Sequence, residues 1–284
     1  MTRHDVVIVH GVGNWRPNAL PTEAAATLAD EWSTSLAAGY ATAGLDHVPP
    51  PRVHAAYYAD LLNDADAQGA LQDDVGSLGQ GERELLLAWL QAAGLPPEPG
   101  DGQAMGTMPI RQALDWFARR RGMPSSALAR IAVALMPEVY SYLTSPKRRG
   151  AVRDLVADTV RATGARVVIA HSLGSIVAYE ALHAHALPSV ELLVTLGSPL
   201  GLPDGVFEAL DPAPTGGRGS RPSSLACWTN IADPGDLVAV PRRLGDRFPV
   251  DSHHEEHIAA LDFHTMRSYL TCGLTATAVV PYLS

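Results

Sequence analysis

The sequence predicts an α/β protein, with a mainly parallel sheet flanked by helices and a helical cap inserted into it. Short apolar runs alternate with longer stretches of helical periodicity, which is the pattern of βαβ units. One long segment, residues 61–145, departs from this alternation and contains helical patterns alone. We therefore expect a core formed by residues 1–60 and 146–284 and a cap, or lid, formed by residues 61–145. With 284 residues, 46% of them hydrophobic, the chain can bury a substantial core.

Five short runs are expected to form the strands of this sheet. They are continuous and mostly apolar, as is typical of strands buried on both faces. In chain order they are residues 6–9, 53–59, 166–170, 190–196 and 227–231. Because helical stretches separate them, we expect neighbouring strands to run parallel.

Helical stretches fill much of the chain between these strands. The first has clear boundaries, since Pro21 and Thr22 favour a helix start and Gly39 favours a helix stop. In chain order the expected helices are 21–38, 82–93, 110–121, 125–142, 147–163 and 173–186, with a last helical part that begins within 263–270. The second, third and fourth of them lie in the cap.

Composition argues against several classes of protein. Lys and Arg total 21 against 30 Asp and Glu, and the resulting net charge of −9 disfavours binding to nucleic acid. The longest apolar stretch is interrupted by Arg130, Pro137 and Glu138, so no transmembrane span is expected. The N-terminal residues lack the pattern of a signal peptide, and two cysteines are too few for a disulfide scaffold. We expect a cytoplasmic location, while the oligomeric state stays open.

A serine stands where the strand at 166–170 should end and the helix at 173–186 should begin. The residues Ala170-His-Ser172-Leu-Gly174 would place Ser172 on a sharp, strained turn with its hydroxyl above the sheet. That turn requires small residues two positions before and after the serine, and Ala170 and Gly174 meet the requirement, although glycine is the usual first residue. The alternative is that Ser172 merely caps the helix.

A glycine-rich turn, His10-Gly-Val-Gly13, follows the first expected strand. Such a turn can aim a backbone N–H at the space above Ser172. An acyl-transfer enzyme needs two such donors for its oxyanion, and we expect the amides of Val12 and Leu173 to supply them. A plain strand-to-helix turn is one alternative. A dinucleotide-binding loop is the other, and it is disfavoured because position 16 is arginine instead of the third glycine.

With these two motifs the chain resembles the α/β-hydrolase superfamily, in particular bacterial lipases and esterases with an HGxG turn and an Ala-x-Ser-x-Gly elbow. The resemblance covers about residues 5–60 and 146–284 and leaves out the cap. It implies the α/β-hydrolase fold and a catalytic triad that runs nucleophile, acid, histidine along the chain.

The resemblance places the acid in the loop after the strand at 227–231, where both Asp233 and Asp236 are available. Asp236 is followed by Leu-Val and matches the family's acid position, whereas Asp233 precedes a proline and is expected to shape the turn. The histidine should precede the last helical segment, which favours His264 and leaves His257 as the reserve candidate.

The stretch 252–257 is rich in His and Glu, which raises the question of a metal site. His254-Glu-Glu-His257 is one residue short of the zinc-binding HExxH spacing, whereas His253 and His257 could share one face of a helix. We expect a solvated surface here, and neither a metal nor an organic cofactor. The basic runs at 119–121 and 147–149 are likewise expected to be solvated.

Apolar residues of the cap have two possible roles. Trp89, Trp116, Phe117 and Met136 lie at helical spacings and are expected in the core of the cap. If the cap closes the site, some of its apolar residues must also line an acyl-binding pocket. The turn at 195–199 is expected to set local backbone geometry near the site.

Together these residues predict a serine hydrolase, of carboxylesterase or lipase type, that cleaves an ester, thioester or related acyl bond in a small-molecule substrate. Ser172 would attack, His264 would take its proton, and Asp236 would orient the imidazole. Two alternatives stay open: an acyltransferase with the same triad, and an inactive hydrolase fold that serves as a binding protein.

Overall fold

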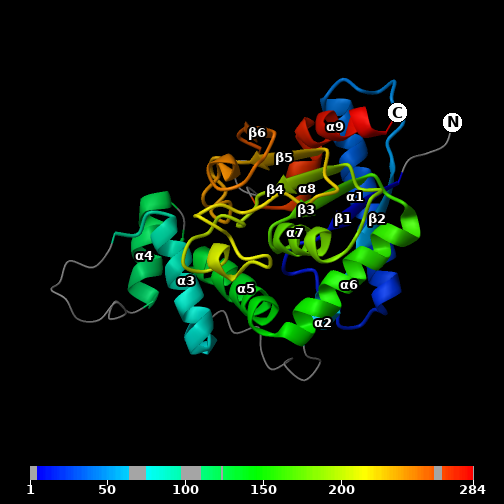
Figure 1. Ribbon diagram of the computed structural model, residues 1–284. Helices are drawn as coiled ribbons and strands as arrows, with labels where there is room; N and C mark the ends of the chain where they lie inside the picture. Colours follow the sequence, from blue (N-terminus) through cyan, green and yellow to red (C-terminus); the bar gives the residue numbers. More distant parts are fainter. Residues whose placement is uncertain (1–4, 64–74, 97–109, 123, 259–263, 284) are drawn as a thin grey trace.

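The computed structural model describes residues 5–63, 75–96, 110–122, 124–258 and 264–283. In this part of the chain, six strands form a single parallel sheet in the order β2-β1-β3-β4-β5-β6 (Figure 1). Their bounds are β1 Asp5–Val9, β2 Arg52–Ala56, β3 Val167–His171, β4 Leu192–Leu196, β5 Cys227–Ala232 and β6 Ser252–Glu255. The α/β class and the parallel sheet predicted from the sequence are confirmed.

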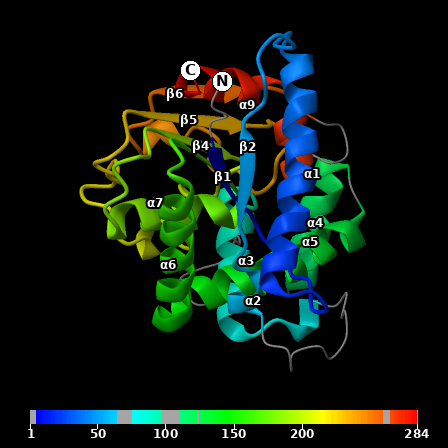
Figure 2. The ribbon, with the colours of Figure 1, turned by 90° about the vertical axis from the view of Figure 1, so that its right-hand side faces the viewer.

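Helices cover both faces of this sheet. Figure 2 shows α1 on one side of the strands and α6 and α7 on the other. The helices are α1 Pro21–Thr42, α2 Ala59–Leu62, α3 Gln80–Ala92, α4 Ile110–Arg121, α5 Ser125–Thr144, α6 Pro146–Thr163, α7 Leu173–Ala184, α8 Met266–Thr271 and α9 Leu274–Val279. None of the helices in the described residues has the length and apolarity needed to cross a bilayer.

Alternating side chains of the strands explain the two layers. In β1, Val6 and Ile8 pack with α1, α8 and α9, whereas Val7 and Val9 face the opposite core with α6 and α7. All five residues of β3 and of β4 are buried. This double burial is why the central strands are continuous apolar runs in the sequence.

The segment between β2 and α6 contributes only helices within the described residues. There α3, α4 and α5 pack against one another, and α5 also contacts α6. Side chains of α3 and α5 lie over the carboxyl ends of the strands, where they line a cavity together with Ser172. The expected boundary between cap and core at 145/146 falls at Ser145, the N-cap residue of α6.

Several expected boundaries were wrong, for physical reasons. Helix α1 runs through Gly39 to Thr42, because Gly39 is needed where α1 meets α8: a Cβ atom there would lie 2.1 Å from the carbonyl oxygen of Leu270. Strand β2 ends at Ala56 and is followed by α2, which begins at Ala59.

The sixth strand was missed. Residues 252–255, expected as a solvated surface, pair in parallel with β5 at the edge of the sheet. An edge strand with exposed polar side chains has no apolar alternation, so the sequence pattern does not reveal it.

Candidate active site

Ser172 stands on the turn between β3 and α7. Its backbone has φ 53° and ψ −128°, which costs a residue with a side chain about 1–3 kcal/mol. Within the described residues its hydroxyl makes no capping bond to α7, so the capping alternative is wrong. The amide of Ser172 donates to the carbonyl of Leu196 at 3.1 Å. Gly174 lets α7 begin against β1, since a Cβ atom there would lie 2.3 Å from the carbonyl oxygen of His10.

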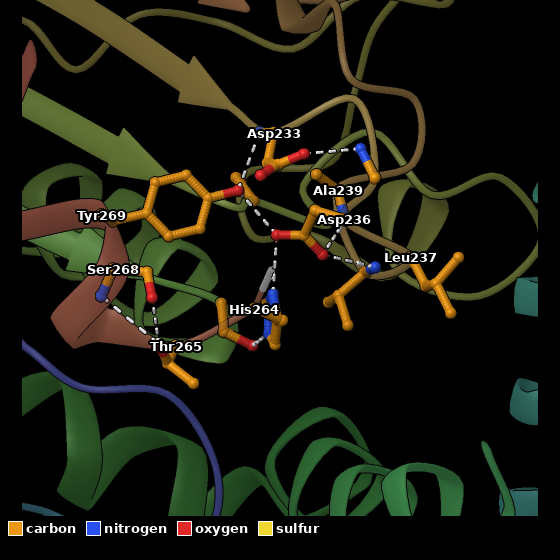
Figure 3. Close-up of polar contacts among 12 residues, drawn as sticks. Asp233, Asp236, Leu237, Ala239, His264, Thr265, Ser268 and Tyr269 are labelled. Carbon is orange, nitrogen blue, oxygen red and sulfur yellow. Dashed lines mark hydrogen bonds and ion pairs between the residues drawn. The ribbon is translucent and has the colours of Figure 1, made fainter. Parts of the chain in front are cut away.

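Ser172, His264 and Asp236 form one hydrogen-bonded chain. Oγ of Ser172 lies 2.9 Å from Nε2 of His264, and Nδ1 of His264 lies 2.8 Å from Oδ2 of Asp236. Figure 3 shows the imidazole pointing at this carboxylate. Because a carboxylate can only accept, Nδ1 carries the hydrogen and Nε2 is left to accept from the serine hydroxyl. Ser172 follows β3, Asp236 follows β5 and His264 precedes α8. The ends of the parallel strands thus help to bring the three residues together.

The Asp236 carboxylate is buried and fully hydrogen-bonded. Oδ2 also accepts the hydroxyl of Tyr269 at 2.7 Å, while Oδ1 accepts the amide of Val238 at 2.8 Å. Burial alone would raise the pKa of Asp236, but the facing His264 and these donors hold it below its ordinary value. Asp236 therefore stays ionised and can stabilise an imidazolium.

Asp233 and His257, the reserve candidates, lie apart from this chain. Asp233 accepts the amides of Gly235 at 2.6 Å and Ile258 at 2.7 Å, so it shapes the loop as expected. Its own amide donates to the hydroxyl of Tyr269 at 3.0 Å (Figure 3). His257 is 85% exposed and has Asp233 as an ion-pair partner at 3.8 Å.

The glycine-rich turn after β1 lies against Ser172. At Gly11 a Cβ atom would fall 2.7 Å from Cβ of Ser172 and 3.1 Å from Nδ1 of His171, so only glycine fits. The buried His10 ring fixes the turn: Nδ1 donates to the carbonyl of Gly11 at 2.6 Å, and Nε2 accepts the amide of Tyr58 at 3.1 Å. Burial lowers the pKa of His10 to about 4, so this ring is neutral.

Of the two amides expected at the oxyanion position, that of Leu173 directly follows Ser172 and that of Val12 directly follows Gly11, which packs against Ser172. Leu173 opens α7, where the first amides lack partners inside the helix, and Val12 follows Gly11 in the turn. Among the described residues, neither amide has a hydrogen-bond acceptor. Both are therefore free to donate to a bound group.

A third histidine lies beside His264. The rings of His171 and His264 have centroids 4.6 Å apart, and Nε2 of His171 has no partner within the described residues. Burial and then the charge of His264 lower the pKa of His171 well below its usual value. His171 thus packs against the imidazole of His264 as a neutral ring.

A narrow apolar cavity of about 30 Å³ opens beside Ser172. Its walls come from the cap helices and from loops of the core, and are formed by Leu85, Trp89, Leu135, Met136, Val139, Pro199, Leu202, Val206 and Val238. Trp89 and Met136 are buried, as expected, and also face this cavity. Nε1 of Trp89 donates to the carbonyl of Leu237 at 2.6 Å, which ties α3 to the loop that carries Asp236.

Within the described residues, no three His, Cys, Asp or Glu side chains are placed to hold a metal ion. His253 lies in strand β6, so the helical spacing considered for His253 and His257 does not apply. The two ring nitrogens of His253 instead face Asn230 at 2.9 Å and Glu255 at 3.0 Å.

Several residues of the site carry no signal in the sequence. Tyr269, five positions after His264, is an ordinary apolar position of α8 until the fold brings it to Asp236. Gly197, in the turn at 195–199, has φ 53°, and a Cβ atom there would lie 2.6 Å from Oδ2 of Asp236. The missing side chain therefore lets the Asp236 carboxylate lie close to this turn.

Comparison with protein-family models, with curated proteins and with solved structures gave no match. What the site can do chemically is therefore inferred from its own geometry.

Proposed function

We propose that this protein is a serine hydrolase with an α/β-hydrolase fold, which cleaves an ester, thioester or related acyl bond. One observation carries the proposal. A serine in a strained backbone conformation is linked through one imidazole to a buried carboxylate, at 2.9 and 2.8 Å, above the carboxyl ends of parallel strands. This is the arrangement that activates a hydroxyl as a nucleophile.

In the first half of the reaction, Oγ of Ser172 attacks the acyl carbonyl carbon while Nε2 of His264 takes the hydroxyl proton. Asp236 holds the imidazole with Nδ1–H and balances its positive charge. The oxyanion forms between the amides of Val12 and Leu173. His264 then gives its proton to the leaving group as the tetrahedral intermediate collapses, and the acyl group stays on Ser172.

In the second half, a water molecule gives its proton to Nε2 of His264 and attacks the acyl carbonyl. The bond to Oγ breaks, Ser172 regains its proton from His264, and the acid leaves. The apolar walls contributed by Trp89 and Met136 favour an acyl group that is itself apolar. Because Ser172 is only 1% exposed, residues that cover it must move for a substrate to enter, and we infer that the cap helices do so.

Hydrolysis of p-nitrophenyl esters of increasing chain length tests this proposal. Wild-type protein should release p-nitrophenol, and Ser172→Ala should lose about six orders of magnitude in kcat. Ser35→Ala on α1 is the matched control and should retain full activity. The hydroxyl of Ser35 donates to the carbonyl of Glu31, and neither residue belongs to the site. A folded Ser172→Ala protein with wild-type activity would contradict the proposal. Product formation only with an added alcohol or amine would identify the acyltransferase instead.

A further inference from the structure

Glu138 is a buried carboxyl group in the middle of the cap helix α5. Its residue is only 7% exposed. Oε1 accepts the amide of Gly13 at 3.1 Å, and Oε2 is buried without a hydrogen-bond partner among the described residues. Its neighbours Met136 and Val139 line the cavity beside Ser172. A buried acid that touches the glycine-rich turn from the cap has no part in the triad chemistry described above.

The contact matters because it fixes one of the two peptide planes that flank Val12. The carbonyl of the Gly11–Val12 peptide accepts Nδ1 of His10 at 2.6 Å and Nδ2 of Asn14 at 3.0 Å. In a planar trans peptide the N–H points opposite to the carbonyl, so these bonds restrain the Val12 amide from one side and leave the peptide on the other side of Val12 to complete the restraint.

The next peptide, Val12–Gly13, is held at both ends. Its carbonyl accepts Nδ2 of Asn14 at 3.2 Å, and its N–H donates to Glu138. Asn14 belongs to the turn itself, whereas Glu138 comes from the cap. Of the contacts that hold this peptide, the bond to Glu138 is thus the one that moves away if the cap moves.

We propose that Glu138 is a positioning residue of the active site: from cap helix α5 it holds the Val12–Gly13 peptide, so that the oxyanion donor at Val12 is set when the cap is docked. This inference rests on the proposed function and extends it to the regulation of the same site. Cap docking then closes the cavity and completes the oxyanion site in one movement.

The surroundings of Glu138 also set its charge. Burial raises the pKa of Glu138 to about 7, and the Gly13 amide and the Asn63 side chain offset this only in part. Tyr57 and Tyr58 face it from the segment after β2, and Asp60 and Arg16 in turn face Tyr57. Among the described residues, no cation contributes to the pKa of Glu138.

The sign of the pH effect follows from this. Below about pH 7 the carboxyl group is neutral, accepts the Gly13 amide through its carbonyl oxygen and adds no charge near the oxyanion. Above that pH it becomes a carboxylate and repels the oxyanion that forms at the neighbouring amide, so the wild-type rate should fall by about tenfold. Glutamine in its place keeps the acceptor and cannot ionise.

The experiment compares wild-type protein with Glu138→Gln, Glu138→Leu and, as the matched control, Glu84→Gln on the exposed face of α3. The rate of p-nitrophenyl ester hydrolysis is measured between about pH 6 and about pH 9. Glu138→Leu should lower kcat about tenfold while KM changes less than about twofold, and Glu138→Gln should restore kcat and abolish the fall above about pH 7. Glu84→Gln should behave as the wild type.

A second readout does not depend on activity. The amide resonance of Gly13 should titrate with a midpoint near pH 7 in wild-type protein and not in Glu138→Gln. A missing Gly13 titration, or a Glu138→Gln protein whose pH profile equals that of the wild type, would overturn the proposal even if Glu138→Leu does not fold. A wild-type protein that shows the titration but no hydrolysis would refute the proposed function, and the positioning role of Glu138 in it.

Discussion

Tyr269 donates its hydroxyl hydrogen to Oδ2 of Asp236 at 2.7 Å, and the same carboxylate oxygen faces Nδ1 of His264 at 2.8 Å. The tyrosine hydroxyl also accepts the amide of Asp233 at 3.0 Å. One side chain of α8 therefore holds both the carboxylate and the loop that carries it. The orientation of the imidazole depends on this support, because a carboxylate that rotates would release His264 from its place beside Ser172.

Replacing Tyr269 by phenylalanine should weaken both activity and stability. The Asp236 carboxylate loses a charge-assisted donor and the Asp233 amide loses its acceptor, so we expect about a tenfold lower kcat and a loss of about 1–3 kcal/mol in the free energy of unfolding. Steady-state kinetics and urea denaturation measure the two effects.

Tyr40→Phe is the matched control for that change. Tyr40 is buried in the same core as Tyr269, but its hydroxyl has no hydrogen-bond partner within the described residues. Removing it should leave kcat unchanged and should not lower stability. Equal effects of the two substitutions would show that Tyr269 does not support Asp236.

Gly197→Ala should disable the site without removing any of its polar groups. The new methyl group would lie 2.6 Å from Oδ2 of Asp236 and displace the carboxylate from His264. We expect kcat to fall by about two orders of magnitude or more, by analogy with the loss of the acid's orienting role. Gly216→Ala is the control for backbone strain. Gly216 has φ 60°, so the substitution strains the backbone in the same way, but the new methyl group meets open space and displaces no side chain. A Gly197→Ala protein as active as Gly216→Ala would contradict this.

A buried ion pair within the core, Arg149 with Glu180, also binds a tyrosine hydroxyl of the cap. Glu180 in α7 accepts bonds from Arg149 of α6, from the hydroxyl of Tyr142 in α5 at 2.7 Å and from the amide of Asp211 at 3.1 Å. The expectation that residues 147–149 are simply solvated was wrong for Arg149, whose side chain is 14% exposed.

Arg149→Met should therefore destabilise the protein by about 3–5 kcal/mol, because it leaves the Glu180 charge buried and unpaired. The urea midpoint of unfolding measures this. Arg166→Met breaks the exposed pair with Glu191 and should leave that midpoint unchanged within error. If both variants unfold at the wild-type urea concentration, the Glu180 network does not hold the fold.

The contribution of His10 to stability should fall as the solution is acidified below about pH 6.5, because burial lowers the pKa of His10 from 6.5 to about 4. Between these values the unfolded chain binds a proton that the folded protein excludes, so the stabilisation is complete above pH 6.5 and is lost as the pH falls towards 4. His10 alone contributes about 3 kcal/mol to this loss. Glu138, whose pKa is raised to about 7, contributes with the opposite sign, so the contribution of His10 is isolated by substitution.

The pH dependence of the urea midpoint tests this origin of the acid sensitivity. His10→Gln should remove this contribution, so that its difference in midpoint from wild-type protein changes as the pH falls. His47→Gln, at an exposed position of the α1–β2 connection, should leave the pH dependence of wild-type protein unchanged. A difference in urea midpoint between wild-type protein and His10→Gln that stays constant from about pH 7 to about pH 4.5 would contradict the neutral, buried state of His10.

Local patterns were enough to predict five of the six strands in the described residues, and a family resemblance supplied two of the three residues that meet at the edge of the sheet. Continuous apolar runs identify β3 and β4, and the strand-turn-helix pattern identified Ser172. Asp236 and His264 were identified through the resemblance to the α/β-hydrolase superfamily, and the structure brings all three into one hydrogen-bonded chain. Their catalytic role stays a prediction.

The supporting residues could not be predicted, because each acts through a partner far away in the sequence. Tyr269 meets Asp236 across 33 positions, and Gly13 meets Glu138 across 125. In the sequence Glu138 only interrupts an apolar stretch, and Arg149 only belongs to a short basic run. Gly39 has the form of a helix stop, yet it is a contact point between two helices.

Reaction with a fluorophosphonate, followed by mass spectrometry of the peptides, tests the central claim most directly. Folded wild-type protein should gain one phosphonyl group, on Ser172, and His264→Ala should react about a thousandfold more slowly because Nε2 no longer takes the hydroxyl proton. Failure of folded wild-type protein to react, or attachment of the group to a residue other than Ser172, would contradict the assignment of Ser172 as the nucleophile.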